Sequence, residues 1–221
     1  ALAPASAGVG LSHSRWIQGV RLEEFNVAAK RGKGTYGAAL YLARIDGLER
    51  RTGPTAEPLG EFGVYDAILS FSYARPYNEK LRWGLSTKLI RQSIFTSTAS
   101  GAAVDAGLLY RLHPDLEVGA ALANVGSMGK LELQSTDLPL LGRVGVAYSG
   151  VERLLLSAQI QTVRERGGDW RLGGEYAVLS SLFLRGGYQS SANRSLSLGV
   201  GLVAGKLELD YAYLPFDRDL G

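Results

Sequence analysis

The sequence has no cysteine, one methionine and two histidines among its 221 residues. Without thiols it has no disulfide framework, no thiolate nucleophile and no cysteine-rich metal site. It also lacks an apolar run of about 18 residues, which excludes a membrane-spanning helix but not spanning strands, since these need only about 9 to 11 alternating residues. Its 24 basic and 21 acidic residues are interspersed, so the net charge of +3 indicates neither a nucleic-acid partner nor a polybasic membrane anchor.

The remaining composition is typical of strands and turns. The chain has 29 glycines, 11 tyrosines and a hydrophobic fraction of 46%, and its length suits one all-β domain over residues 1–221. The pattern is clearest in residues 102–124, where side chains alternate between two faces of a hairpin that turns at 113–115. The apolar face carries Ala102, Val104, Ala106, Leu108, Tyr110, Leu112, Leu116, Val118, Ala120 and Leu122. The other face is rich in Gly, Ala and charge, which is typical of a wetted lumen.

The same alternation predicts thirteen strands along the chain. They are expected near residues 8–16, 20–30, 35–44, 62–74, 81–89, 102–112, 116–124, 140–148, 154–162, 170–176, 182–189, 195–202 and 207–213. Their connections alternate between long ones, such as 45–61, 93–101 and 125–138, and short ones, such as 113–115 and 204–205. This asymmetry is typical of antiparallel up-and-down outer-membrane barrels, and it places the long connections on one rim.

Aromatic residues give a second indication of a transmembrane barrel. Two sets are expected to form girdles at the two membrane interfaces, namely Tyr73, Tyr110, Tyr148 and Tyr176 before short turns, and Trp170, Tyr188, Tyr211 and Tyr213 toward long loops. Between the girdles the apolar row is expected to face lipid, as at Leu69, Phe71, Leu108, Leu122, Val146 and Leu198. Alternation alone is equally compatible with a soluble β-sandwich binding protein whose apolar row faces a core. Strand number and girdles together favour the barrel.

The charged residues of the opposite row are candidate lumen residues. They are Asp66, Arg82, Lys88, Asp105, Arg111, Glu117, Arg143, Arg171, Glu175, Arg185 and Asp210. Structural ion pairs are the usual occupants of such positions, so these residues are expected to form a polar network with one another or with water, and ligand contact is the alternative.

The sequence predicts no catalytic, cofactor-binding or metal site, and thus no enzyme. Ser12, His13 and Ser14 are adjacent, but neighbouring strand residues point to opposite faces and do not converge as a nucleophile and base must. His113 lies in a turn. The run 32–35, Gly-Lys-Gly-Thr, lacks the spacing and the following helix of a phosphate-binding loop.

Four short motifs resemble the PorV/PorQ family, whose fold is similar to that of the FadL long-chain fatty-acid transporters. They are His-Ser-Arg-Trp-Ile-Gln-Gly-Val-Arg at 13–21, Phe-Ser-Tyr-Ala-Arg at 71–75, Leu-Ala-Asn-Val-Gly at 122–126 and Leu-Asp-Tyr-Ala-Tyr-Leu-Pro-Phe at 209–216. The resemblance runs in order over nearly the whole chain. It implies a FadL-like barrel of about fourteen strands in the bacterial outer membrane, surrounded by its lipid. It also implies transport across that membrane or a partnership with secreted proteins, as in type IX secretion.

Two departures from the family pattern limit this comparison. The small-residue segment that ends in Asn-Pro-Ala, similar to the FadL hatch, is represented at most by Ala1 to Ala3, and the final strand with its terminal aromatic is missing. A closing fourteenth strand is therefore expected after residue 221, because an open edge in hydrocarbon leaves backbone groups unpaired. Three functions remain: a secretion-system partner, a FadL-like conduit for hydrophobic small molecules, and an open porin. The porin fits least, because long side chains such as Arg82 and Arg143 would fill a barrel of this size.

Overall fold

Thirteen strands form one antiparallel sheet in the computed structural model, which describes residues 7–54, 57–131, 134–135, 137–190 and 196–215. Each strand pairs with its neighbours in the chain, which is an up-and-down order. The strands are β1 (Ala7–Arg15), β2 (Arg21–Arg31), β3 (Gly34–Arg50), β4 (Gly60–Pro76), β5 (Leu81–Ile94), β6 (Ser97–His113), β7 (Leu116–Met128), β10 (Leu141–Val151), β11 (Leu154–Val163), β12 (Gly167–Leu179), β13 (Leu182–Gln189), β14 (Leu196–Ala204) and β15 (Leu207–Tyr213). The predicted all-β, up-and-down architecture is confirmed.

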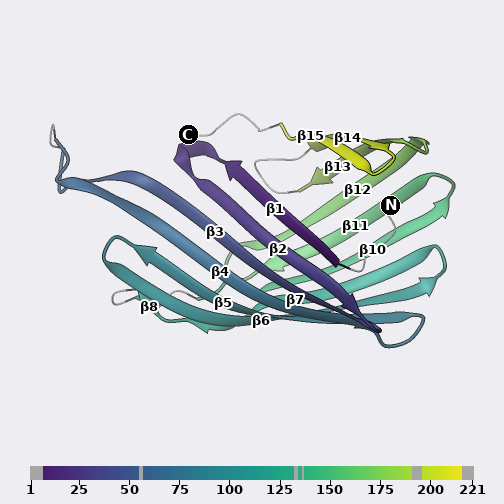
Figure 1. Ribbon diagram of the computed structural model, residues 1–221, viewed down its shortest axis with the longest axis horizontal. Helices are drawn as coiled ribbons and strands as arrows, with labels where there is room; N and C mark the ends of the chain where they lie inside the picture. The colour runs from purple at the N-terminus through teal and green to yellow at the C-terminus, as the bar shows by residue number, and fades with distance from the viewer. Residues whose placement is uncertain (1–6, 55–56, 132–133, 136, 191–195, 216–221) are drawn as a thin grey trace.

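The sheet curves around on itself as the wall of a barrel (Figure 1). Short elements lie in its connections, namely the 3-10 turn η1 (Ile17–Gly19) after β1 and the separate two-stranded sheet of β8 (Lys130–Leu131) and β9 (Gln134–Ser135) between β7 and β10. No helix in the described part of the chain is long and apolar enough to cross a membrane. The expected fourteenth strand would follow residue 221 and stays a prediction.

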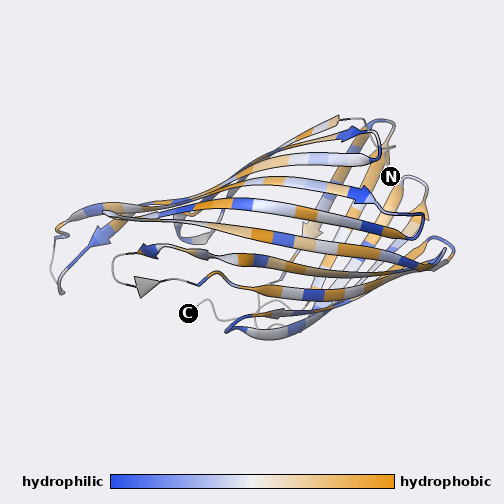
Figure 2. Ribbon diagram, turned by 90° about the horizontal axis from the view of Figure 1, so that it is seen from below, coloured by the Kyte–Doolittle hydropathy of each residue, from blue (hydrophilic) through white to orange (hydrophobic). Residues whose placement is uncertain are grey.

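The two faces of the wall differ as the alternation predicts, and Figure 2 shows hydrophilic and hydrophobic residues alternating along the strands. Large apolar side chains cover the outer face and are exposed, with 37% to 53% of the surface open at Leu69, Phe71, Leu108, Leu122, Val146 and Leu198. Among the described residues only Ala99, Ala103 and Leu138 are buried apolar residues. A β-sandwich would bury its apolar row between two sheets, so that alternative is wrong.

Aromatic rings cluster on the outer face near the ends of the strands. Close to the short turns, the ring centroids of Tyr36 and Tyr73 are 4.9 Å apart and those of Tyr73 and Trp83 are 5.6 Å apart. Toward the opposite rim, the rings of Trp170 and Tyr188 lie 5.1 Å apart. The ring clusters therefore mark two levels on the same face of the sheet.

The expected loop at residues 93–101 is wrong. β5 runs to Ile94 and β6 starts at Ser97, so only two residues join them. Phe95 adopts a positive φ of 54°, its ring packs edge-to-face on Phe62 at 5.8 Å, and the guanidinium of Arg50 lies 5.0 Å from its centroid. Phenylalanine rarely adopts a positive φ, so its presence in the sequence does not indicate a turn. The Ser and Thr residues of 97–100 pair with β5 as strand residues.

The other two long connections are shorter than expected. Strands occupy both ends of the range 45–61, which leaves 51–59, and β7 extends to Met128, which leaves 129–140. The β11 to β12 connection, residues 164–166, is also a tight turn. The antiparallel order nevertheless places these connections on one rim and the 113–115 turn on the other, and the β3–β4 hairpin projects beyond its neighbours at the left of Figure 1. These ends are called the long-loop rim and the short-turn rim below.

Candidate functional site

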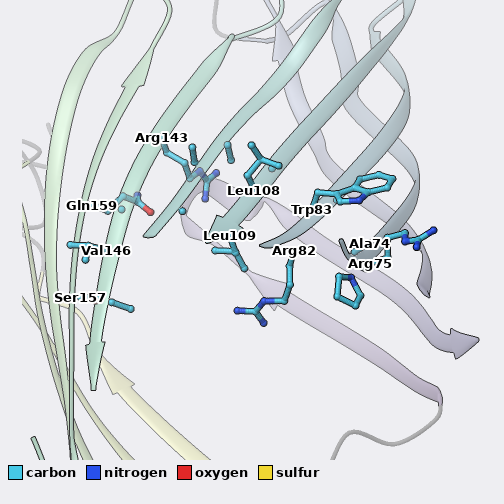
Figure 3. Close-up of a pocket in the computed structure, with 18 of the residues that line it drawn as sticks. Ala74, Arg75, Arg82, Trp83, Leu108, Leu109, Arg143, Val146, Ser157 and Gln159 are labelled. Atoms are coloured by element: carbon cyan, nitrogen blue, oxygen red, sulfur yellow. The ribbon is translucent and has the colours of Figure 1, made fainter. Parts of the chain in front are cut away.

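A cavity of about 1210 Å³ opens on the inner face, toward the short-turn rim. Strands β5, β6, β7, β10, β11 and β12 line it, together with the ends of the β2–β3 hairpin and of β4. Figure 3 shows Arg82, Arg143, Ser157 and Gln159 around this space. Its volume exceeds the roughly 300 to 1,000 Å³ of ordinary small-molecule pockets, so there is room for a solute and for water.

Small residues on the inner face of neighbouring strands create this space. They are Gly84, Gly107, Gly119, Ala121, Gly145, Ala147 and Gly173. Because alternate residues of a strand face the same side, each of these positions would carry a lumen side chain if a larger residue replaced it. A Cβ built on Gly107 would meet only the Ala120 carbonyl oxygen at 3.6 Å and the Ala121 Cβ at 3.8 Å, which is ordinary van der Waals contact. Residue size, rather than backbone crowding, keeps the cavity open at Gly107.

The charged side chains that line the cavity are all basic. They are Lys30, Lys33, Arg82, Arg143 and Arg171, while Arg75 lies at the edge, where its strand position places its side chain on the outer face with Tyr73. Arg82 forms an ion pair with Glu117, and the Arg171 Nε donates to Asp169 Oδ1 at 3.0 Å. Arg143 is exposed and forms no ion pair with any residue that the structure describes. The cavity is thus positive, with the Arg143 guanidinium uncompensated.

A second charged group lies farther along the wall, where a β-bulge interrupts β7. Ala123 and Asn124 together oppose Asp105, and Asn124 has a positive φ of 62°. The Lys88 Nζ is 2.6 Å from Asp105 Oδ2 and donates to Asn124 Oδ1 at 2.9 Å, while the Asn124 backbone N–H donates to Asp105 Oδ1 at 2.8 Å. The extra residue of a bulge re-aims a side chain, which here places Asn124 on the inner face beside the ion pair.

The bulge also holds the connection that precedes β10. The side-chain amide of Asn124 donates to the Pro139 carbonyl at 3.0 Å. Beyond Ala123, no residue of β7 pairs with β10, although β7 continues to pair with β6 as far as Met128. Asn124 therefore links the end of the β7–β10 pairing to the segment 137–140, in which Leu138 is buried.

The last strands carry a third group, centred on Arg185 of β13. Its Nε donates to Glu175 Oε2 on β12 at 2.6 Å, and its Nη1 donates to Asp210 Oδ1 on β15. One guanidinium on β13 thus joins carboxylates of two other strands, β12 and β15, with Arg185 in register with Glu175. The geometry is that of a cross-strand ion-pair network.

The candidate lumen residues fall into these groups, with two exceptions. The structure brings together Arg82 with Glu117, Lys88 with Asp105, and Arg185 with Glu175 and Asp210, whereas Arg171 pairs with Asp169. Asp66 has a buried Oδ1 without a hydrogen-bond partner in the described part of the chain. Arg111 is exposed near the short-turn rim, and no ion pair joins it to a described residue.

Sequence reasoning missed two members of these groups. Asp169 is two residues from Arg171 on the same face of β12, a spacing that could have suggested the pair. Asn124 could have been singled out as a residue that tolerates positive φ inside an otherwise regular strand. Its contacts with Lys88 and Pro139, 36 and 15 residues away, depend on the register and could not be predicted locally.

The two histidines considered for catalysis lie apart from the cavity, whereas the 32–35 run lies at its edge. The His13 Nδ1 is 3.6 Å from Glu23, across the β1–β2 pair, and the His113 Nδ1 is 3.6 Å from Asp115 in the β6–β7 turn. The two glycines of the 32–35 run lie in and beside the β2–β3 turn, and a strand follows them. The structure therefore brings neither histidine into the lumen groups described above.

Comparison with solved structures identifies relatives in fold. The chain is similar to the Ralstonia pickettii toluene transporter TbuX, with 14% identity, a TM-score of 0.62 and coverage of 97% of this chain and 82% of that one. It is also similar to the P. putida toluene transporter TodX, with 12% identity, a TM-score of 0.64 and coverage of 94% and 80%. A deltaS2 mutant of TodX, described as a monoaromatic hydrocarbon channel, matches at 14% identity with a TM-score of 0.59 and coverage of 82% and 72%.

No protein-family model and no curated protein sequence matches the chain. At these identities the structural matches show the fold alone, which is that of the FadL-like barrels. The PorV/PorQ resemblance is not supported beyond this shared fold.

Proposed function

We propose that this chain forms the wall of an outer-membrane barrel that admits hydrophobic small molecules through its lumen. The observation that carries the proposal is the 1210 Å³ cavity on the inner face of a wall whose outer face is covered by exposed apolar side chains. An exposed apolar band of this extent is stable when it faces lipid. The fold relatives are described as toluene transporters, which supports a hydrophobic solute.

The conduit is preferred to the two other functions considered. Arg82, Arg143 and Arg171 project into the cavity, so a wide water-filled pore is disfavoured. No feature of the described residues favours a secretion-system partner, and we do not propose that role. The proposal assigns no chemical step to the chain, only passage of a solute.

An uptake assay tests the conduit. The full-length protein is produced in a bacterial host whose lipopolysaccharide leaflet excludes hydrophobic compounds, and entry of the dye N-phenylnaphthylamine is followed by its fluorescence. We expect entry to be several-fold faster than in the same host without the protein, while entry of a hydrophilic β-lactam stays unchanged. Equal dye uptake at verified surface expression would contradict the conduit, and accelerated entry of the β-lactam would indicate an open pore instead.

Epitope tags test the orientation of the barrel. A tag inserted after Gly53, in the 51–59 connection, is expected to bind antibody on intact cells, because long loops of such barrels face outward. A tag between Pro114 and Asp115 is expected to bind only after the outer membrane is permeabilised. The reverse labelling would show that the topology is inverted, and labelling of both tags on intact cells would show that the membrane is leaky.

A further inference from the structure

The short-turn rim carries an uncompensated basic patch where two hairpins end side by side. The patch consists of Lys30, Arg31, Lys33, Arg75 and Lys80, all exposed, and the nearby Glu79 is the one acidic residue in the 29–36 and 73–83 segments. None of the five basic residues forms an ion pair with any residue that the structure describes. Five free cations on adjacent strand ends favour an anionic partner.

The strand register aligns two of these arginines on the outer face. Arg31 of β2 lies opposite Gly34 of β3, and the next strand, β4, places Arg75 beside Gly34. The ring of Tyr73 covers Gly34, because its Cε2 lies 2.6 Å from the position that a glycine Cβ would take. The backbones of Arg31 and Arg75 are two strand spacings apart, about 10 Å. Their long side chains lie on both sides of the Tyr73 ring, so the two guanidinium groups can converge on a single phosphate.

Aromatic side chains surround the pair of arginines. Trp83 of β5 lies opposite Arg75, and its ring is 5.6 Å from that of Tyr73. Tyr36 and Tyr77 are exposed to 53% and 72%. Tyr and Trp prefer the headgroup level of a bilayer, so the patch combines cations with the residues that mark this level.

At the opposite rim, the basic residues around the end of β3 are arranged differently. On β3, the Arg44 Nε is 2.8 Å from Asp46, and just beyond that strand the Arg51 Nη2 is 2.8 Å from Glu49. Local carboxylates thus neutralise these guanidiniums. Residues 44–61, which form the end of the β3–β4 hairpin, hold three arginines and four acidic residues, so this end has no excess of positive charge, in contrast to the short-turn end.

We propose that the ends of the β2–β3 and β4–β5 hairpins bind the phosphate headgroup of an anionic phospholipid in the leaflet that the short turns face. Arg31 and Arg75 take the phosphate by charge-assisted hydrogen bonds, Lys33 and Lys80 add positive potential, and the acyl chains lie along the apolar outer row. This inference rests on the proposed membrane location of the barrel. It adds a lipid site on the outer face that solute passage does not require.

Fluorescence quenching by brominated lipids tests the proposal at the site itself. Residues 1–221 contain three tryptophans, so Trp16→Phe with Trp170→Phe, and the same change at any tryptophan outside this range, leaves Trp83 as the reporter within the patch. The full-length protein is reconstituted in phosphatidylcholine vesicles that contain an equal fraction of brominated phosphatidylglycerol or brominated phosphatidylcholine. We expect brominated phosphatidylglycerol to quench Trp83 with an apparent affinity about fivefold higher than that of brominated phosphatidylcholine. This difference is expected to shrink in high salt.

Two matched sets of substitutions separate this site from general charge effects. Arg31→Gln, Lys33→Gln, Arg75→Gln and Lys80→Gln together should make the two lipids quench equally. The control set Arg15→Gln, Arg21→Gln, Arg91→Gln and Arg166→Gln removes the same charge at the long-loop rim and should keep the preference. A preference that survives the first set, or is lost in the control set, overturns the proposal.

The remaining outcomes distinguish this proposal from the function on which it rests. Equal quenching by both lipids in the otherwise unchanged protein overturns the headgroup site alone, because Trp83 still lies against lipid. Absence of quenching by either lipid contradicts the membrane-facing wall and thus the proposed function as well. Loss of the preference on adding inorganic phosphate at constant ionic strength would identify a free-phosphate site and overturn the lipid assignment.

Discussion

Replacing Leu108 by arginine is expected to destabilise the membrane-inserted barrel by about 2 to 4 kcal/mol if the residue lies near the bilayer midplane, and by less toward the interface. Leu108 is on the outer face of β6 and 53% exposed, so a charge there would face hydrocarbon. The free energy of unfolding from lipid vesicles is measured by urea titration, with the folded barrel detected by its faster migration in unheated gel samples.

The neighbouring residue gives the matched control for this substitution. Leu109 lies one position along the same strand, in register with Arg82 and Gly119 on the inner face, and is 42% exposed. Leu109→Arg adds the same charge at the same depth, but in a space already lined by Arg82 and Arg143. Its free energy of unfolding should change by well under half of that for Leu108→Arg. Equal losses in both variants would contradict the assignment of the two faces.

Replacing Gly107 by phenylalanine is expected to reduce uptake of N-phenylnaphthylamine several-fold. A Cβ at this position has no contact closer than 3.6 Å, so the new ring can extend into the cavity without displacing the backbone. The cavity narrows, and solute passage falls while the wall remains folded. Uptake is measured in intact cells at matched surface expression, and folding is checked by heat-modifiable migration.

The residue before Gly107 provides its control. Ala106 lies on the outer face of β6 and is exposed, so Ala106→Phe adds the same ring outside the lumen. We expect dye uptake to remain at the unsubstituted level in this variant. If the two phenylalanine variants reduce uptake equally, the solute does not pass through the described cavity.

Much of the wall could be predicted from single segments of sequence. The alternation in residues 102–112 assigns each β6 side chain to one of two faces, because a strand repeats every two residues. It predicted that Leu108 would lie on the outer face and Asp105 on the inner face, where the structure places them. Turn positions were harder to predict from the sequence. The positive φ of Phe95, for example, is stabilised by Phe62 and Arg50, which come from other strands.

The candidate site depended more strongly on tertiary structure. The sequence shows which charges face inward, but not which of them meet. Asp105 contacts Lys88 because β5 and β6 pair in one particular register, and Asn124 joins them because a bulge turns its side chain inward. The cavity likewise requires small residues of five strands to meet on one side of a curved sheet.

The sequence by itself therefore determined the strands, their two faces and the up-and-down order, since all three follow from local alternation and short connections. Only the tertiary structure decided the ion-pair partners, the open volume around Gly107 and the alignment of Arg31 with Arg75 across the Tyr73 ring. The physical reason is that strand register and sheet curvature are set by contacts between distant segments. A shift of two residues in one pairing would keep every face and change every partner.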